Sequence, residues 1–287
     1  PKAAVEPRTE RLGSLNRYYL ATWQNMANGS DMELVPNTIA DITALPLTGT
    51  ENVAIVVHGR ESSAFKELFT ALVTADKDMA VILVDWSFIS YLSYDQAAQL
   101  VPSVAADLIV FIAHMESSGK LNRDLLHLIG FDLGAHIVGI SSRNPIARAR
   151  KITALSPAGN LWDAFSQRLR ATDAQFVETI HTDAVGTSAF GVKEAIGGLD
   201  FFPNGATIQP GCAEDDNWCY HNRAWQLFAA TVDTGGHLLG LRCDSMTDVN
   251  NNSCVRLPVA ILGTLELIKL PVGLYRVNTG GIYPYSA

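Results

Sequence analysis

The stretch DLLHLIGFDLGAHIVG, residues 124–139, decides the fold of this chain of 287 residues. Its first part, 125–129, is mostly apolar and favours a strand buried on both faces, and the small apolar residues that follow favour a packed helix. Gly130 and Gly134 would let strand and helix approach closely around a sharp turn, with Asp132 held in a strained conformation above the sheet. We therefore predict a strand, a sharp turn and a helix. An ordinary turn with a capping aspartate is the alternative.

Apolar runs rich in Val, Ile and Leu alternate with segments of helical spacing along the rest of the chain. This alternation is typical of an α/β fold, and we expect a mostly parallel, doubly wound central sheet with helices on both faces. No internal repeat or linker interrupts it, so we predict a single domain over residues 1–287. The predicted strands are 52–57, 80–84, 125–129, 152–155 and 176–181, the predicted helices are 62–74, 96–116 and 221–232, and short edge strands are predicted at 273–277 and 281–285.

The composition excludes several classes of function. The formal net charge is −8 and the basic residues form no cluster, so the chain would repel phosphate backbones and anionic membrane surfaces. We therefore expect no nucleic-acid partner. The most apolar stretch, 101–114, contains Pro102 and Asp107 and is too short to cross a bilayer. We predict no transmembrane segment.

The four cysteines lie in the last third of the chain and form two short-range neighbour pairs. We predict disulfides between Cys212 and Cys219 and between Cys243 and Cys254. A zinc site is the alternative, but it would favour the tighter C-x-x-C spacing. Glycosylation sequons at Asn28 and Asn251 also fit an oxidising compartment. These features predict a secreted, extracellular protein.

Seven further motifs follow one another along the chain: Val56-Val57-His58-Gly59, Leu83-Val84-Asp85-Trp86, Leu133-Gly134-Ala135-His136, Leu155-Ser156-Pro157-Ala158-Gly159, Ile180-His181-Thr182-Asp183, Asp200-Phe201-Phe202-Pro203-Asn204-Gly205 and Cys219-Tyr220-His221-Asn222-Arg223-Ala224. In this order they resemble the pancreatic lipase family of α/β-hydrolases across nearly the whole chain. The resemblance implies an α/β-hydrolase fold with a nucleophile elbow at residues 130–134. We expect the appended C-terminal β-sandwich of that family to be missing.

The departures from the family fall at the residues of chemistry. By the resemblance, position 132 would hold the triad serine, position 156 the triad aspartate and position 221 the histidine. This chain has Asp132, Ser156 and His221, with Phe131 where the family usually has histidine. A triad needs a hydroxyl from which the histidine takes a proton and a carboxylate behind the imidazole. An ionised aspartate that attacked an ester would form a reactive anhydride. Serine-type ester hydrolysis is therefore not expected, and Asp132 could instead form a static ion pair with His221.

Other parts of the site are expected to be partly intact. By the resemblance, the backbone N–H groups of Arg60 and Leu133 would form the oxyanion hole. The family usually has an aromatic residue at position 60, and the cation of Arg60 could either reach Asp132 or point to solvent. The remaining histidines of the motifs match positions outside the triad, for which we expect packed or hydrogen-bonded structural roles. They are His58, His136 and His181.

The lid and the calcium site of the family look altered. The loop between the first two cysteines, 213–218, is short and resembles the phospholipase A1-like branch, whose truncated lids leave the site open; Trp218 would either touch an apolar ligand or pack on the disulfide. At the positions that match the calcium ligands stand Phe165 and Arg170, which leaves Asp173 as the remaining carboxylate. Calcium needs several oxygen ligands, so we predict no metal. No cofactor is expected.

Three hypotheses follow for the function. The first is a lipase-like protein without lipase activity that binds, stores or carries a small apolar, lipid-like ligand, similar in this respect to insect yolk proteins. The second is an enzyme of another class, like epoxide hydrolases or haloalkane dehalogenases, with Asp132 as nucleophile or base, His221 activating water and Asp183 as an alternative acid. The third, a lipase inactivated in the laboratory, is less natural because several departures occur together.

Overall fold

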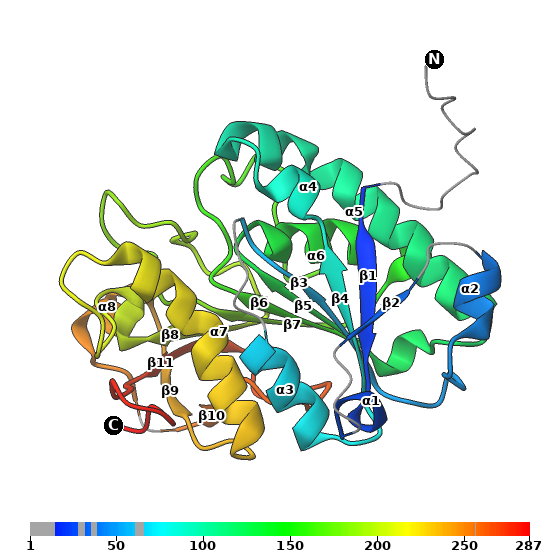
Figure 1. The fold of residues 1–287 in the computed structure, drawn as a ribbon. Coiled ribbons are helices and arrows are strands. Elements are labelled where there is room, and N and C mark those ends of the chain that lie inside the picture. The colour runs from blue at the N-terminus through cyan, green and yellow to red at the C-terminus, as the bar shows by residue number, and fades with distance from the viewer. Residues whose placement is uncertain (1–14, 28–31, 36–38, 61–65, 256) are drawn as a thin grey trace.

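The computed structural model describes residues 15–27, 32–35, 39–60, 66–255 and 257–287. Its centre is one sheet of eleven strands in the order β10-β9-β11-β8-β7-β6-β5-β3-β4-β1-β2 (Figure 1). The strands from β4 to β11 in this order run parallel, and antiparallel pairs close both ends of the sheet. The strands are β1 Arg17–Ala21, β2 Glu33–Val35, β3 Val53–Val57, β4 Ala80–Asp85, β5 Leu126–Phe131, β6 Lys151–Leu155, β7 Phe176–Ile180, β8 Leu199–Pro203, β9 Leu239–Cys243, β10 Val259–Ile261 and β11 Gly273–Val277.

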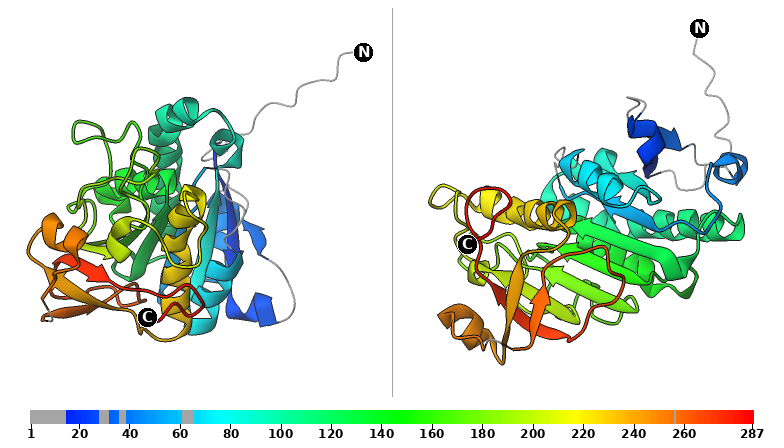
Figure 2. Two further views of the ribbon diagram at one scale, coloured as in Figure 1. Left: turned by 90° about the vertical axis from the view of Figure 1, so that its left-hand side faces the viewer. Right: turned by 90° about the horizontal axis from the view of Figure 1, so that it is seen from below.

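Helices cover both faces of this sheet (Figure 2). One face packs its apolar side chains against α5 and α6, and the other packs against α3 and α7. The fold is therefore the predicted α/β architecture, and within the described residues no β-sandwich is present. The α-helices are α1 Trp23–Ala27, α2 Ile39–Ala44, α3 Lys66–Ala75, α4 Ser87–Ser90, α5 Tyr94–Ser117, α6 Leu133–Arg143, α7 Asn217–Asp233 and α8 Met246–Asn251, and the short 3-10 helices are η1 Arg123–Leu125, η2 Pro145–Ala147 and η3 Asn204–Ala206.

The central strands are buried along their whole length, as their apolar sequences predict. Every residue of β3, β5, β6 and β7 is buried. Such strands have both faces covered by helices, so alternation of apolar and polar residues is absent from them. Since β5 lies between β3 and β6, the turn at its carboxyl end stands in the middle of the sheet edge.

Two sequence predictions about the end of the chain need correction. Residues 281–285 form turns rather than an edge strand, and an isolated bridge joins Thr279 to Ser286 beside them. The predicted strand 273–277 exists as β11, but it is an interior strand. It pairs in parallel with β8 and antiparallel with β9, because β9 and β10 add two more strands outside it. The predicted helix 62–74 is seen as α3 from residue 66, and its first residues lie outside the described part of the chain.

Helix α5 is longer than the apolar stretch that we read in the sequence. Pro102 stands inside it without ending it, and the helix is long and apolar enough to span a membrane by those two criteria alone. Its apolar residues, however, pack into the core between the sheet and α6; they include Val101, Leu108 and Ile112. A core helix passes the same test, so this is weak grounds for a membrane span.

The turn between β5 and α6 has the predicted sharp geometry. Asp132 adopts a φ of 54° and a ψ of −122°, a region that side-chain-bearing residues rarely occupy. Added Cβ atoms at the flanking glycines would overlap backbone: at Gly130 the nearest atom is the Gly134 oxygen at 2.4 Å, and at Gly134 it is the Val57 oxygen at 2.3 Å. Glycine is therefore required on both sides of the apex.

Gly134→Ala should destabilise the protein strongly. The new methyl would meet the carbonyl oxygens of Val57 and His58 at 2.3 and 2.6 Å, and backbone of a central strand cannot move aside cheaply. We expect the free energy of unfolding in urea to fall by about 3 kcal/mol, at the upper end of overpacking costs. Gly198→Ala is the control, since its nearest heavy atom would lie at 3.6 Å, and it should change the free energy of unfolding by less than about 1 kcal/mol. Equal effects of the two substitutions would refute this explanation.

Candidate functional site

The carboxylate of Asp132 is bound by a backbone N–H that the sequence assigns to the oxyanion hole. Its Oδ2 accepts a hydrogen bond of 2.9 Å from the backbone N–H of Arg60. Burial alone would raise the pKa of Asp132, but His221 and the nearby backbone N–H groups of Arg60 and Leu133 lower it below its ordinary value. One of the two donors predicted to form the oxyanion hole is thus directed at a side chain of the protein itself.

His221 lies beside Asp132 on helix α7. Its Nε2 is 3.5 Å from Asp132 Oδ1, and its Nδ1 is 3.1 Å from the hydroxyl oxygen of Ser156 and 3.8 Å from Asp183 Oδ2. The four side chains are buried, and Asp132 is the most exposed of them at 8%. The structure therefore brings together the three altered triad positions and the alternative acid, which come from four different segments of the chain.

Asp183 is near the imidazole but is held by other donors. Its Oδ2 accepts the backbone N–H of Phe190 at 2.8 Å, and its Oδ1 accepts the side-chain amide of Asn217 at 2.9 Å. Burial raises the pKa of Asp183 despite these bonds. Ser156, at the matching end of β6, has a φ of 40° and provides the closest partner of Nδ1. A hydroxyl at this place cannot stabilise an imidazolium as a carboxylate does.

Arg60 contributes its backbone to Asp132 and its side chain to a neighbouring loop. The guanidinium Nε donates to the carbonyl of Leu92 at 3.3 Å, on the segment between α4 and α5. The aromatic residue that the family usually has here is thereby replaced by a cation that binds the loop after β4. Contact with Asp132 is made by the main chain, which any residue at position 60 would provide.

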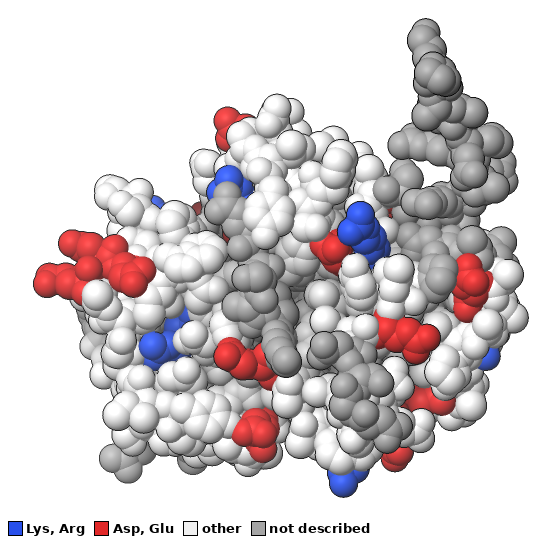
Figure 3. Space-filling model, viewed as in Figure 1, with Lys and Arg blue, Asp and Glu red and all other residues white. Residues whose placement is uncertain are grey.

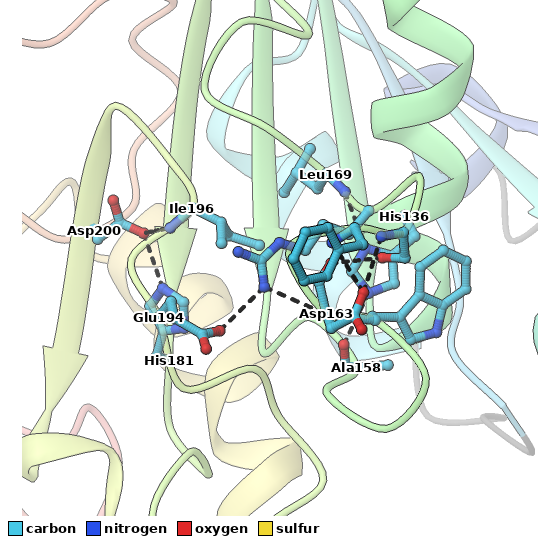
Figure 4. Close-up of polar contacts among 12 residues, drawn as sticks. His136, Ala158, Asp163, Leu169, His181, Glu194, Ile196 and Asp200 are labelled. Atoms are coloured by element: carbon cyan, nitrogen blue, oxygen red, sulfur yellow. Dashed lines mark hydrogen bonds and ion pairs between the residues drawn. The ribbon is translucent and has the colours of Figure 1, made fainter.

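Two histidines outside the site hold its loops in place (Figure 4). His136 Nδ1 accepts the backbone N–H of Leu169 at 3.2 Å and its Nε2 donates to the carbonyl of Ala158 at 2.8 Å. His181 Nε2 lies 2.9 Å from Asp200 Oδ1. Both have the hydrogen-bonded structural roles that we predicted.

His58 is engaged in the same way on the other side of the elbow. Its Nδ1 bonds the carbonyl of Gly59 at 2.7 Å, and its Nε2 accepts the backbone N–H of Trp86 at 3.2 Å. The Trp86 indole in turn donates to the carbonyl of His58 at 2.8 Å. These bonds connect the end of β3 to the end of β4, and so fix the backbone on which the Arg60 N–H stands.

His136 should make stability depend on pH. Burial is the main cause that lowers its pKa to about 4, whereas an unfolded histidine titrates near 6.5. Between pH 6.5 and pH 4 the unfolded chain therefore binds a proton that the folded chain refuses, so stability falls as the pH falls. We expect this residue to account for a loss on the order of 3 kcal/mol across that window. In His136→Gln, urea unfolding curves at pH 7 and pH 4.5 should differ less than in the unsubstituted chain, and an unchanged difference would be inconsistent with this assignment.

Both predicted disulfides are formed. Cys212 bonds Cys219, and Cys243 bonds Cys254. The first bridge closes the short lid-like loop, which ends in the first turn of α7 close to Asn217 and Trp218. Trp218 is half exposed, at 51%. The loop also carries three acidic side chains, Glu214, Asp215 and Asp216. Acidic groups gather at the left edge of the face shown in Figure 3.

The region that matches the calcium site is held by an arginine. The carboxylate of Asp173 accepts the Nε and Nη2 groups of Arg143 at 2.8 and 3.0 Å, and also the backbone N–H of Arg170 at 2.9 Å. Phe165 is almost fully exposed. Among the described residues no group of three or more His, Cys, Asp or Glu side chains is arranged to hold a metal ion. The remaining carboxylate thus has a cationic partner from the protein.

Exposed apolar side chains lie on the segments that carry the site, and one of them contacts His221. Phe190 packs edge-on against the imidazole at 5.6 Å between ring centres. Three more exposed apolar residues lie on nearby segments. The backbone carbonyl of Leu92 accepts a hydrogen bond from Arg60. Leu161 follows Asn160, whose carbonyl binds Tyr94, and Trp218 follows Asn217, which binds Asp183. These residues lie on segments that follow the carboxyl ends of β4, β6 and β7 and on the start of α7, the edge where α/β sheets bind ligands.

The sheet order, the strained elbow and the histidine that follows β8 define an α/β-hydrolase. A family model described as Lipase matches residues 5–260. The chain belongs to the pancreatic lipase family of α/β-hydrolases. It is 33% identical over 253 residues to "Lipase member H" of Mus musculus. The match covers 83% of this chain and 54% of that protein. It is 29% identical over 272 residues to "Pancreatic triacylglycerol lipase" of Sus scrofa, covering 84% and 59% respectively.

The chain therefore spans about half the length of these curated relatives. Among solved structures, a phospholipase/carboxylesterase from Dyadobacter fermentans is similar with a TM-score of 0.36 and 18% identity, over 47% of this chain and 67% of that one. An α/β hydrolase from a deep-sea metagenome library matches with a TM-score of 0.33 and 13% identity, over 54% and 65%.

Proposed function

We propose that this lipase family member binds a small apolar, lipid-like ligand without hydrolysing it through an acyl-serine. The observation that carries the proposal is the carboxylate of Asp132 at the elbow, with its Oδ2 2.9 Å from the Arg60 N–H. A tetrahedral intermediate needs that N–H for its own oxyanion, and the nucleophile needs a hydroxyl that His221 can deprotonate. Asp132 occupies the N–H and has no hydroxyl. The exposed ring of Phe190, which packs against His221, and the exposed apolar side chains of the neighbouring segments support the binding of an apolar molecule.

We also propose that the protein is secreted and carries glycan at Asn251. Two formed disulfides support an oxidising compartment. Asn251 ends α8 and is exposed with the rest of its sequon, so an attached sugar would meet no packed neighbour. The sequon at Asn28 lies outside the described residues.

Ester hydrolysis tests the proposed function. Rates for a short-chain p-nitrophenyl ester and for a phospholipid should be equal in the unsubstituted protein and in His221→Ala, both at the level of the uncatalysed reaction. Equilibrium dialysis against octanol should at the same time detect binding. A rate above background that His221→Ala abolishes would overturn the proposal.

A second function is favoured by one observation, the Asp183 carboxylate 3.8 Å behind His221 Nδ1. With Asp132 held ionised, its Oδ1 could attack a carbon of an epoxide and break the carbon–oxygen bond. An alkyl ester forms, and the released alkoxide takes a proton from solvent. His221 would then activate water to attack the ester carbonyl, which is held by the two backbone N–H groups. The existing bonds of Asp183 to Phe190 and Asn217 make it a weaker support for the imidazole than a dedicated acid.

Labelling of Asp132 separates this second function from the first. A single turnover of an epoxide in heavy-oxygen water should place one heavy oxygen in the carboxylate of Asp132, and in His221→Gln the alkyl ester should accumulate on the Asp132 peptide. Mass spectra of that peptide without either label, across epoxides and alkyl halides, would exclude alkyl transfer and leave the binding function.

A further inference from the structure

The two oxygens of the Asp132 carboxylate are in different situations. Oδ2 is bound by the N–H of Arg60 at 2.9 Å, whereas Oδ1 has His221 Nε2 at 3.5 Å, longer than a normal N–H···O bond. His221 Nε2 correspondingly has no hydrogen-bond partner in the described part of the chain. A carboxylate oxygen accepts up to two hydrogen bonds, so Oδ1 retains capacity for a donor. The site therefore presents a buried acceptor rather than a donor to whatever lies against it.

Negatively charged groups lie beside His221 and on the loop that leads into its helix. Asp183 lies on the far side of His221, and the loop before α7 contains Glu214, Asp215 and Asp216 with no Lys or Arg between its cysteines. Arg60 supplies a positive charge, with its Nε bound to the carbonyl of Leu92. An anionic head group placed on Oδ1 would face the ionised carboxylate of Asp132 in a poorly hydrated site. A cationic head group would instead form a charge-assisted hydrogen bond.

Apolar contacts lie within the same surroundings. Phe190 stacks edge-on upon His221, and Trp218 belongs to the first turn of the helix that carries His221. Both rings are exposed. Aromatic faces bind both hydrocarbon chains and ammonium groups. A ligand that has a cation at one end and a hydrocarbon chain at the other would satisfy both parts of the site.

We propose that the ligand is a cationic amphiphile, namely a primary amine on an apolar chain, whose ammonium group donates to Asp132 Oδ1. This inference rests on the proposed binding function and specifies its ligand. This arrangement differs from a serine hydrolase site, in which two free N–H donors bind the negative charge that develops in the transition state. Here the N–H of Arg60 is used by Asp132, and the group that faces the ligand is an acceptor.

Calorimetric titration with three ligands of equal chain length tests the proposal at pH 7. Octylamine should bind at least tenfold more tightly than octanoate, with octanol between them. Butylamine, which has the charge and a shorter chain, should bind more weakly than octylamine if the site rather than the net charge of the protein selects the ligand. In Asp132→Asn the side chain keeps its size, and octylamine and octanol should differ by less than threefold.

A second variant guards against misfolding of the first. Glu214→Gln combined with Asp215→Asn changes only exposed side chains and should weaken octylamine severalfold more than octanol. Tightest binding by octanoate, lost in Arg60→Gln, would overturn the inference and assign the head group to the guanidinium. Binding of octanol with no preference for the amine would overturn this inference alone. Failure of all three ligands to bind would overturn the proposed binding function as well.

Discussion

The double substitution D132S/S156D is expected to create ester hydrolysis in this protein. It would put a hydroxyl at the apex of the elbow, beside His221 Nε2, and a carboxylate next to Nδ1, where the hydroxyl of Ser156 already lies at 3.1 Å. Removal of the aspartate would also release the N–H of Arg60 for an oxyanion. Because these parts act as a unit, we expect the rate on p-nitrophenyl butyrate to rise roughly 100-fold or more above that of the unsubstituted chain.

The single substitutions are the controls for this gain. D132S alone has Asp183 at 3.8 Å from Nδ1 as its remaining acid, so its rate should fall between those of the unsubstituted chain and the double variant. S156D alone lacks a hydroxyl nucleophile and should stay at background. Addition of His221→Ala to the double variant should remove the gain. A double variant that folds with unchanged stability and remains inactive would contradict our assignment of the oxyanion hole.

Glu178→Gln should cause the largest loss of stability among polar substitutions in the sheet. Glu178, on β7, binds Lys151 on β6 at 3.0 Å and Lys269 at 2.7 Å, and all three side chains are buried. Burial alone would raise the pKa of Glu178, but the two lysines lower it to about 2, and burial lowers the pKa of Lys151 to about 8. Removal of the carboxylate charge leaves two buried cations uncompensated, which typically costs about 3–5 kcal/mol.

A surface ion pair provides the matched control for this loss. Glu194 binds Arg168 at 3.1 Å, but the carboxylate is 64% exposed. Exposed pairs contribute about 0–1 kcal/mol, so Glu194→Gln should leave the free energy of unfolding in urea almost unchanged. Both variants are compared at pH 7, where Lys151 still carries most of its charge. Equal unfolding midpoints for Glu178→Gln and the unsubstituted chain would show that the buried cluster does not stabilise the sheet.

Much of the fold could be predicted because its central strands are continuous apolar runs and its elbow needs glycine. Gly130 and Gly134 indicate the close approach of β5 and α6. A Cβ added at either glycine would lie within 2.4 Å of a backbone oxygen. The outer strands were harder to predict. In β9 only Gly240 and Cys243 are fully buried, so its residues give no clear strand period, and without β9 and β10 the strand β11 looked like an edge.

The site could be predicted only as far as the resemblance reached. It placed Asp132, Ser156 and His221 together. In the structure the imidazole of His221 lies 3.5 Å from Asp132 Oδ1 and 3.1 Å from the hydroxyl oxygen of Ser156. The sequence could not predict that Asp132 would take the N–H of Arg60, because this depends on side-chain length against a backbone distance. It also missed Phe190 and Asn217 as partners of Asp183, since the first bond depends on the path of the loop after β7 and the second joins residues 34 positions apart. A polar residue inside the cysteine-bounded loop was the available signal for Asn217.

Reaction with a serine-directed fluorophosphonate tests the central claim most directly, because the reagent needs a deprotonated hydroxyl and a free oxyanion hole at the same place. Intact mass and peptide mapping are measured for the unsubstituted protein, D132S/S156D and D132S/S156D/H221A. Our account predicts one phosphonyl adduct at position 132 of the double variant and none on the other two. An adduct on the unsubstituted protein at Ser156, lost in His221→Ala, would contradict it, because the hydroxyl of Ser156 would then be a working nucleophile.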